Sequence, residues 1–238
     1  MSGKSKAEEI RKFLASQLAK NEFAVMYLGN SGVLVRTSNQ AIVIDPADLL
    51  KEDEVKALKG INLLLFTHGH GDHFNLAEAV RIFKTTGAPI LAEPKVVDEL
   101  KGKIPPNKLA IASSGRTYNI GDITVKAVQG IHRGPIIVYQ AKMGDLTLFH
   151  AGDSGYVTVE DYLSDVAFLP TGSPSPTASP EDAFKMASEL KPIVAVAIHG
   201  SQGQSKEFER KVKEKMPQTT VVIMEPYVSR TIALPRKA

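Results

Sequence analysis

The sequence predicts an α+β protein in which two β-sheets are flanked by helices. Short β-rich runs followed by a helical stretch occur twice along the 238 residues, which is the layout expected of two helix-covered sheets. Hydrophobic residues make up 43% of the chain, enough for a substantial core. No Pro-, Gly- or Ser-rich stretch is long enough to separate two domains, so we expect one domain over residues 1–238.

The first half of the chain opens with an amphipathic helix over about residues 5–20. Its apolar residues recur at helical spacing among charged ones: Ile10, Phe13, Leu14 and Leu18. The pattern then changes to short apolar runs typical of strands, at residues 23–28, 32–36, 41–45 and 61–67. A helix from Leu76 to Lys84, a strand at 89–93 and a helix from Val96 to Leu100 follow.

The second half begins with four predicted strands and ends with alternating helices and strands. The strands lie at residues 123–129, 135–141, 146–151 and 165–170. A helix from Pro180 to Leu190 has proline in its first turn, where a missing backbone N–H costs nothing. A buried strand at 193–199, a helix from Lys206 to Met216 and a strand at 220–225 complete the chain.

Composition excludes several classes of protein. The net charge is only +3, with no long Lys/Arg block, so a dedicated nucleic-acid binder is not indicated. The chain has no cysteine, which excludes disulfides, thiolate metal sites and a cysteine nucleophile. No run approaches the roughly 20 apolar residues of a membrane span, and the opening MSGKSKAEEIRKF carries charge where a signal peptide is apolar. We therefore expect a cytoplasmic protein with no membrane partner.

Three histidines and a carboxylate stand together directly after a predicted strand, in His68-Gly69-His70-Gly71-Asp72-His73. The two glycines allow backbone conformations that bring neighbouring side chains together. Imidazole and carboxylate together suit zinc, iron or manganese. The alternative is a surface cluster or an anchored turn, but the position at a strand end favours a metal site.

Further candidate ligands follow other predicted strands. His132 comes shortly after the strand at 123–129, Asp153 comes after the strand at 146–151, and His199 ends the strand at 193–199. Ligands delivered from several strand ends form a rigid constellation, and the loops beyond them can build a pocket.

Together these segments resemble the metallo-β-lactamase superfamily. HGHGDH matches the superfamily's His-x-His-x-Asp-His signature, and AIVIDP, GIH at His132, AGDS at Asp153 and AIHG at His199 follow the family's order. The resemblance implies a four-layer αββα sandwich with a binuclear metal site at the edge of its two sheets.

The resemblance also implies a role for each candidate ligand. One metal would be held by His68, His70 and His132, and the second by Asp72, His73 and His199. Asp153 would bridge both metals, and Asp72 and Asp153 would be the catalytic carboxylates. Asp45 is similar to the carboxylate that orients ligand histidines in the family. A simple turn-capping role for Asp45 before Pro46 is equally open.

Within the superfamily, the chain most resembles the branch that includes ascorbate-6-phosphate lactonase. The segments YLGNSG…VIDP, FHAGDSGY and LPTG…SPEDA…LKP…AIHG carry this likeness. The chain departs from that branch at Gly29-Asn30, where Gly-His is common, and at Gly172-Ser173-Pro174, where Gly-Gly-His is common. These segments border the substrate pocket in the family, so the substrate stays open.

The implied chemistry is hydrolysis by a metal-bridging hydroxide. Two divalent ions, Zn or Mn with Fe as an alternative, lower the pKa of a shared water to about 7. Two ligand carboxylates leave a surplus of positive charge, which favours an anionic ester or lactone. A phosphodiesterase or nuclease of the same superfamily and a non-catalytic metal-binding regulatory module are the alternatives.

Several other polar residues have two interpretations. His150 is expected to be a hydrogen-bonded core histidine. Tyr156 is a candidate general acid, or else a stacking or buried tyrosine. The hydroxyls of the 171–180 loop either hold a phosphate or sugar or face water: Thr171, Ser173, Ser175 and Thr177. The N-terminal helix is a candidate for covering an interface in a homo-oligomer.

Overall fold

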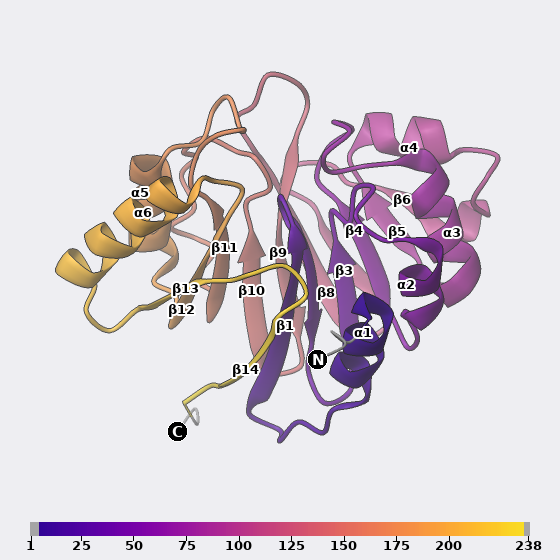
Figure 1. Cartoon of the computed structure of the whole chain (residues 1–238). Coiled ribbons are helices and arrows are strands. Elements are labelled where there is room, and N and C mark those ends of the chain that lie inside the picture. Colours follow the sequence, from indigo (N-terminus) through magenta and orange to yellow (C-terminus); the bar gives the residue numbers. More distant parts are fainter. Residues whose placement is uncertain (1–4, 236–238) are drawn as a thin grey trace. The chain divides into compact units, whose positions relative to one another are not determined.

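The computed structural model describes residues 5–235, which divide into two compact units with one seven-stranded sheet each (Figure 1). Within the described residues, the first unit comprises residues 5–111 and 225–235, and the second comprises residues 112–224. Both sheets are mixed and carry helices, so the prediction of two helix-flanked sheets is confirmed. Residues 1–4 and 236–238 of the expected domain lie outside the described residues.

The sheet of the first unit is antiparallel at one end and parallel at the other. Its strand order is β14-β1-β2-β3-β4-β5-β6. Strands β14, β1, β2 and β3 pair antiparallel, whereas β3, β4, β5 and β6 pair parallel. The strands are β1 (Glu22–Gly29), β2 (Gly32–Arg36), β3 (Ala41–Ile44), β4 (Leu63–Phe66), β5 (Ile90–Ala92), β6 (Leu109–Ile111) and β14 (Ser229–Ala233).

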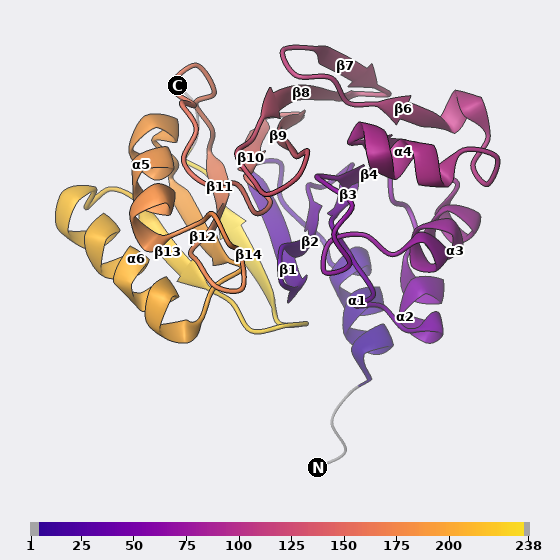
Figure 2. The same cartoon turned by 90° about the horizontal axis from the view of Figure 1, so that it is seen from above.

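The helices of the first unit lie next to this sheet (Figure 2). Their apolar sides are buried in one core with it. They are α1 (Lys6–Ala15), α2 (Glu52–Ala57), α3 (Leu76–Thr86) and α4 (Pro94–Leu100), followed by the short 3₁₀ turn η1 (Pro106–Lys108). Ile10, Val55, Ile82 and Val96 supply one side chain from each helix to a cluster that also contains Leu64 of β4. Burial of such apolar surface is the main favourable term holding the helices to the sheet.

Helix α1 is shorter than the periodicity predicts, because it ends at Ala15 rather than near residue 20. The Arg36 guanidinium in β2 donates hydrogen bonds to the carbonyls of Phe13 and Leu14, at 2.8 and 2.7 Å. These carbonyls belong to the last turn, where the helix supplies no further N–H groups, and the Phe13 carbonyl also accepts from the N–H of the C-cap residue Ser16 at 3.4 Å. Leu18 lies beyond the helix end and still packs against the same core.

The second unit repeats the mixture of antiparallel and parallel pairing. Its order is β13-β12-β11-β10-β9-β8-β7, with β7 to β10 antiparallel and β10 to β13 parallel. Helices α5 (Pro180–Leu190) and α6 (Gln202–Lys215) lie side by side (Figures 1 and 2) and share a core with the sheet. The strands are β7 (Thr117–Ile120), β8 (Ile123–Gln129), β9 (Ile137–Met143), β10 (Leu146–His150), β11 (Val166–Pro170), β12 (Val194–Ile198) and β13 (Thr220–Ile223).

Four short elements, α2, β6, β7 and β14, have too weak an apolar pattern to be predicted from sequence. Strands β7 and β14 are mostly exposed or half-buried, so they lack the buried alternation that marks a strand. Helix α6 begins at Gln202, four residues before the predicted start, because Ser201 and Gln204 form a reciprocal capping box. No helix within residues 5–235 is long and apolar enough to cross a membrane.

A buried carboxyl group lies within the first unit, where Glu78 of α3 is fully buried. Its Oε1 accepts a hydrogen bond from the Leu50 N–H at 2.7 Å. Burial is the largest influence and raises the pKa of Glu78 to about 8, while the Leu50 hydrogen bond lowers it and the charges of Asp48 and Glu54 raise it. The folded protein therefore holds a proton on Glu78 that the unfolded chain releases at a much lower pH.

We expect Glu78 to make folding stability fall as pH rises from about 4.5 to about 8. In this window the unfolded chain carries a carboxylate and the folded chain carries the neutral acid, so raising the pH favours unfolding. Glu78→Gln keeps an acceptor for Leu50 without the charge, and its stability advantage over wild type should grow across the window. Urea unfolding at about pH 5, 7 and 9 measures this. The exposed Glu99→Gln is the control, and parallel profiles for Glu78→Gln and wild type would contradict the prediction.

Candidate metal centre

In the first unit, two neighbouring parallel strands deliver candidate ligands at the same sheet edge. Strands β3 and β4 pair in parallel, and Asp45 directly follows β3 while His68 lies two residues beyond β4. The chain then turns, with the N–H groups of His73 and Phe74 both donating to the carbonyl of His70 at 2.9 Å. This turn places the predicted ligands of the HGHGDH segment before α3 begins.

The Asp45 carboxylate organises this half of the site. It is fully buried and accepts hydrogen bonds from the Thr67 N–H at 2.8 Å and the Thr67 hydroxyl at 2.5 Å. Its Oδ2 also lies 2.9 Å from Nδ1 of His73. Nδ1 of His68 lies 3.0 Å from the same Thr67 hydroxyl. Asp45 therefore orients His73 directly and His68 through Thr67, beyond what a turn-capping role alone requires.

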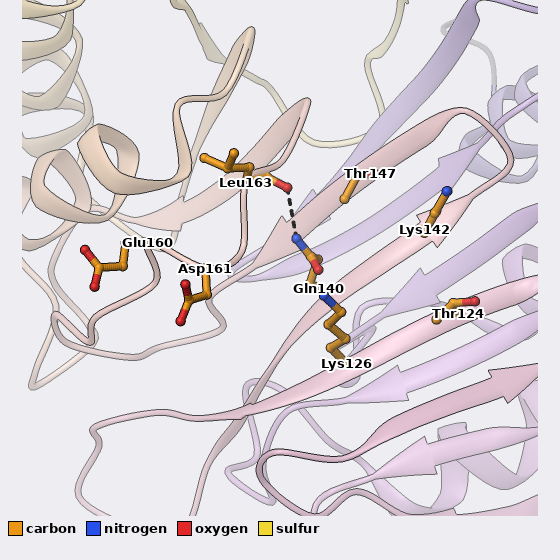
Figure 3. A pocket seen from close by; sticks show the side chains of 8 residues that line it. All are labelled: Thr124, Lys126, Gln140, Lys142, Thr147, Glu160, Asp161 and Leu163. Carbon is orange, nitrogen blue, oxygen red and sulfur yellow. Dashed lines mark hydrogen bonds between the residues drawn. The ribbon is translucent and has the colours of Figure 1, made fainter.

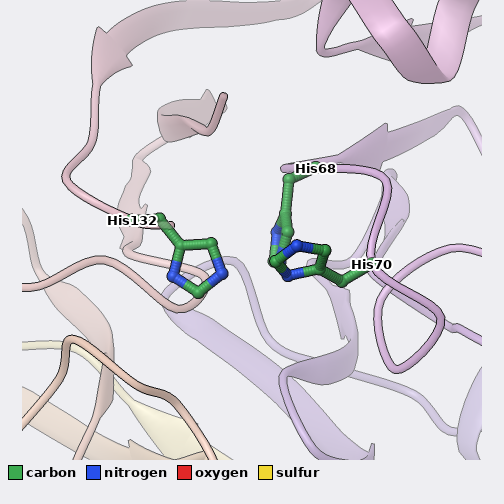
Figure 4. Close-up of side chains that lie close together, drawn as sticks. All are labelled: His68, His70 and His132. Carbon is green, nitrogen blue, oxygen red and sulfur yellow. The ribbon is translucent and has the colours of Figure 1, made fainter. Parts of the chain in front are cut away.

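The HGHGDH side chains are brought together in two pairs. Nε2 of His68 lies 3.1 Å from Nδ1 of His70, and their rings meet edge to face with centroids 4.7 Å apart (Figure 4). Nε2 of His73 lies 3.8 Å from Oδ2 of Asp72. His68 and His73 are buried, Asp72 is half-buried and His70 is exposed. Each pair thus directs two potential donor atoms toward a common point.

In the second unit, the strand directions bring three more predicted ligands to one sheet edge. Strand β9 pairs antiparallel with both β8 and β10, and β10, β11 and β12 are parallel, so β8, β10, β11 and β12 end at the same edge. His132 follows β8, Asp153 follows β10 and His199 follows β12. Nε2 of His199 lies 3.2 Å from Oδ1 of Asp153, and both residues are buried.

The segment after β11 contacts all three of these residues. Thr177 Oγ1 lies 3.1 Å from Nδ1 of His132 and donates to the main-chain carbonyl of Asp153 at 2.9 Å. Ser175 donates to the same carbonyl at 2.9 Å, and the N–H of Gly172 donates to the carbonyl of His199.

Hydroxyls of the 171–180 loop make hydrogen bonds within the protein. Those of Ser175 and Thr177 donate to the main-chain carbonyl of Asp153, in the loop after β10. Thr171 is fully buried, with its hydroxyl 3.2 Å from that of Ser205. Of the four hydroxyl residues, Ser173 alone is exposed.

The backbone is held in unusual conformations at both sheet edges. Asp45 has φ 46° and His199 has φ 41°, a left-handed region that non-glycine residues seldom occupy. Such conformations persist where surrounding contacts determine them, and they cluster at functional sites. Gly200, next to His199, has no room for a side chain, because a Cβ there would lie 1.9 Å from Thr171 Oγ1.

Tyr156 and His150 have structural partners. The Tyr156 hydroxyl donates to Glu189 of α5 at 2.5 Å, and this hydrogen bond is the main cause of the raised pKa of Tyr156. The ring also packs against the core of the second unit, so the structure favours the structural interpretation over a general acid. His150 is fully buried in β10, and its Nδ1 accepts a hydrogen bond from the Gly152 N–H at 3.2 Å, as expected of a core histidine.

A hollow of about 490 Å³ lies on the sheet of the second unit, and Figure 3 shows the residues that line it. None of the predicted site residues lines it, and its wall combines basic and acidic side chains with Gln140, which donates to the carbonyl of Leu163 at 2.9 Å. The lining residues are Thr124, Lys126, Gln140, Lys142, Thr147, Glu160, Asp161 and Leu163.

The donor atoms fit first-row divalent metal ions. Asp45, His68 and His73 form one group of potential ligand atoms within 4.8 Å of one another. Nδ1 of His73 faces the Asp45 carboxylate, which only accepts hydrogen bonds, so the neutral His73 ring carries its lone pair on Nε2. Neutral imidazoles and carboxylates, without thiolates, suit zinc, manganese or iron.

Comparison with known proteins identifies the class to which this fold and these ligands belong. Residues 24–199 match the family model described as the beta-lactamase superfamily domain. The chain is 29% identical over 233 residues to a UPF0173 metal-dependent hydrolase of Aeropyrum pernix, covering 84% of this chain and 93% of the relative.

Solved structures show the same fold. Igni18, a metallo hydrolase from Ignicoccus hospitalis, is similar with a TM-score of 0.76 and 24% identity, covering 90% of this chain and 100% of that one. The metallo-beta-lactamase fold protein YhfI from Bacillus subtilis is similar with a TM-score of 0.70 and 13% identity, covering 89% and 100%.

The chain belongs to the metallo-β-lactamase superfamily, and the predicted superfamily and α+β fold class are confirmed. Its curated relatives are named metal-dependent hydrolases, which supports enzymatic activity and metal binding. The likeness to the lactonase branch stays a prediction.

We expect Asp45→Asn to destabilise the fold and loosen the histidines that Asp45 orients. Three donors lose a charged acceptor in a buried position, and each hydrogen bond to a charged group contributes about 1.5–3 kcal/mol. Chemical unfolding with a chelator present should show a loss of about 2 kcal/mol or more. The exposed Asp48→Asn, three residues along the chain, is the matched control. Equal stability of the two variants would show that Asp45 only caps a turn.

Proposed function

We propose that the two sets of ligands act together as one binuclear metal centre that hydrolyses a small anionic ester or lactone in the cytoplasm. The observation that carries this proposal is the pairing of donor atoms within each unit, His68 with His70 in the first and Asp153 with His199 in the second. The family match supports combining the sets, because residues 24–199 contain members of both. The curated relatives named as metal-dependent hydrolases support the reaction class.

In this proposal, His68, His70 and His132 would hold one metal ion, Asp72, His73 and His199 would hold the other, and Asp153 would be a ligand of both. His68 offers Nε2, because its Nδ1 faces Thr67, and His70 offers Nδ1, which lies 3.1 Å from that Nε2. His73 offers Nε2 toward Asp72. Zinc, manganese and iron all accept this donor set, and zinc or manganese is our first choice.

Bound divalent ions would supply Lewis acidity and a nucleophilic water at neutral pH. The carboxylates of Asp72 and Asp153 would hold and orient that water as hydrogen-bond acceptors. Two ligand carboxylates contribute −2 against +4 from two divalent ions, so the site would attract an anionic group and stabilise negative charge that develops during hydrolysis. The mild net charge of +3 and the absence of a Lys/Arg block support a small molecule over a nucleic acid.

A substrate screen combined with metal analysis tests this function. The metal-reconstituted protein is assayed against sugar-phosphate lactones, carboxylic esters, phosphodiesters and thioesters, and bound metal is counted in the same samples. We expect two metal ions per chain and turnover of a lactone or ester. Turnover of phosphodiesters alone would favour the phosphodiesterase alternative. Two bound metals without turnover of any class would favour a regulatory metal-binding module.

Asp153→Asn should abolish most hydrolysis while leaving the protein folded. The substitution keeps the shape of the side chain but removes the negative charge proposed to hold both metals. We expect kcat to fall about a thousandfold or more, with a much smaller change in KM. Steady-state kinetics and thermal melts on Asp153→Asn and on the exposed Asp161→Asn provide the comparison. Near-normal turnover in Asp153→Asn would overturn the bridging role.

A further inference from the structure

The hydroxyl of Thr177 joins two proposed metal ligands within the second unit. Its Oγ1 lies 3.1 Å from Nδ1 of His132 and 2.9 Å from the main-chain carbonyl oxygen of Asp153. Thr177 itself carries none of the chemistry assigned to the metal ligands. Its contacts nevertheless determine how one of those ligands is presented.

Counting protons determines the direction of both hydrogen bonds. A threonine hydroxyl has one proton, and the carbonyl oxygen of Asp153 can only accept, so the Thr177 proton goes to Asp153. The remaining lone pairs of Oγ1 can then only accept, which makes Nδ1 of His132 the donor. A neutral imidazole with its proton on Nδ1 carries the lone pair on Nε2. Thr177 therefore selects Nε2 as the metal-binding atom of His132.

The first unit contains the same arrangement with a different final acceptor. The Thr67 hydroxyl donates to the Asp45 carboxylate and faces Nδ1 of His68 at 3.0 Å. Both threonines thus pass their single proton to an acceptor-only oxygen and leave the hydroxyl oxygen for a histidine N–H. The recurrence in two separate sheets supports a positioning role for the hydroxyl at residue 177.

The surrounding segment fixes Thr177 in place. Ser175 Oγ accepts from the N–H groups of Thr177 and Ala178, at 3.4 and 3.3 Å, and donates to the carbonyl of Asp153. Gly155 lies against the Thr177 backbone, where a Cβ would come within 2.9 Å of the Thr177 carbonyl oxygen. Thr177 is therefore held by its main chain as well as by its side chain.

We propose that Thr177 is a positioning residue that holds the neutral His132 ring with its proton on Nδ1 and its metal-binding lone pair on Nε2. This proposal rests on the proposed function, in which His132 is a metal ligand. Loss of the hydroxyl would remove the acceptor of the Nδ1 proton, so the proton could move to Nε2, which removes the lone pair from the metal-binding position. Partners of this kind typically contribute about 10–100-fold to metal affinity.

The test compares three variants of the full-length chain by zinc competition against a chromophoric chelator. Thr177→Val keeps the branched shape without the hydroxyl and should weaken zinc binding about 10–100-fold. Thr177→Ser restores the hydroxyl and should recover most of the affinity. Thr124→Val is the matched control, because it removes a threonine hydroxyl of the second unit that binds Asn119 and has no contact with a proposed ligand. Its affinity should stay near that of wild type.

A spectroscopic measurement on the metal-free wild type keeps the proposal testable even if Thr177→Val fails to fold. Long-range proton–nitrogen NMR of the histidine rings, at a pH well above the ordinary histidine pKa of about 6.5, should show the His132 proton on Nδ1. A proton on Nε2 would overturn the proposal, as would Thr177→Val binding zinc like wild type.

His132→Ala separates this proposal from the function on which it rests. If His132→Ala weakens zinc binding and folded Thr177→Val does not, only the role of Thr177 is wrong. If His132→Ala leaves zinc binding unchanged, His132 is not a ligand and the proposed centre is wrong as well.

Discussion

The orientation of neutral imidazole rings is the constraint on which the candidate metal centre depends. A histidine can bind a metal only through the nitrogen that lacks a proton, so the fold must fix the proton on the other nitrogen. Asp45 does this for His73, and Thr67 and Thr177 do it for His68 and His132. Each partner is tied to the protein by further hydrogen bonds, so the ring orientation is set before any ion arrives.

Strand direction explains why these partners are available where they are needed. Parallel strands end at one edge of a sheet, so the residues that follow them meet without long connecting loops. In the first unit, this rule brings Asp45 after β3 next to Thr67 and His68 after β4. In the second, it brings the segment after β11 beside the loops that follow β8, β10 and β12. Asp45 and His199 adopt left-handed backbone conformations, which are strained for non-glycine residues. This strain accompanies the placement of their side chains at the sheet edges.

The sequence suffices to select the candidate ligands and the Asp45 carboxylate, but not the two threonines that orient His68 and His132. The HGHGDH segment is recognisable because six consecutive residues carry four donors, and the long apolar runs of β4 and β12 mark the strands before His68 and His199. Thr177 lies 45 residues from His132, and a single threonine in a Pro/Ser-rich loop has no distinctive pattern. The end of α1 was equally unpredictable, because Arg36 binds its last carbonyls from another element. Both contacts join residues that are far apart in the sequence, so the local spacing of apolar residues does not predict them.

The two orienting arrangements differ in charge, and this difference bears on how firmly each ligand is held. The Thr67 hydroxyl that faces His68 donates to the buried carboxylate of Asp45, which also accepts from His73. A negative charge makes these hydrogen bonds stronger than neutral ones and raises the basicity of both rings as ligands. The Thr177 hydroxyl that faces His132 donates to the neutral main-chain carbonyl of Asp153, which also accepts from Ser175. His68 and His73 therefore share one charged anchor, whereas His132 depends on the hydrogen-bond geometry of a neutral loop. Of the three rings, His132 is the one whose position a change in the 171–177 segment would alter first.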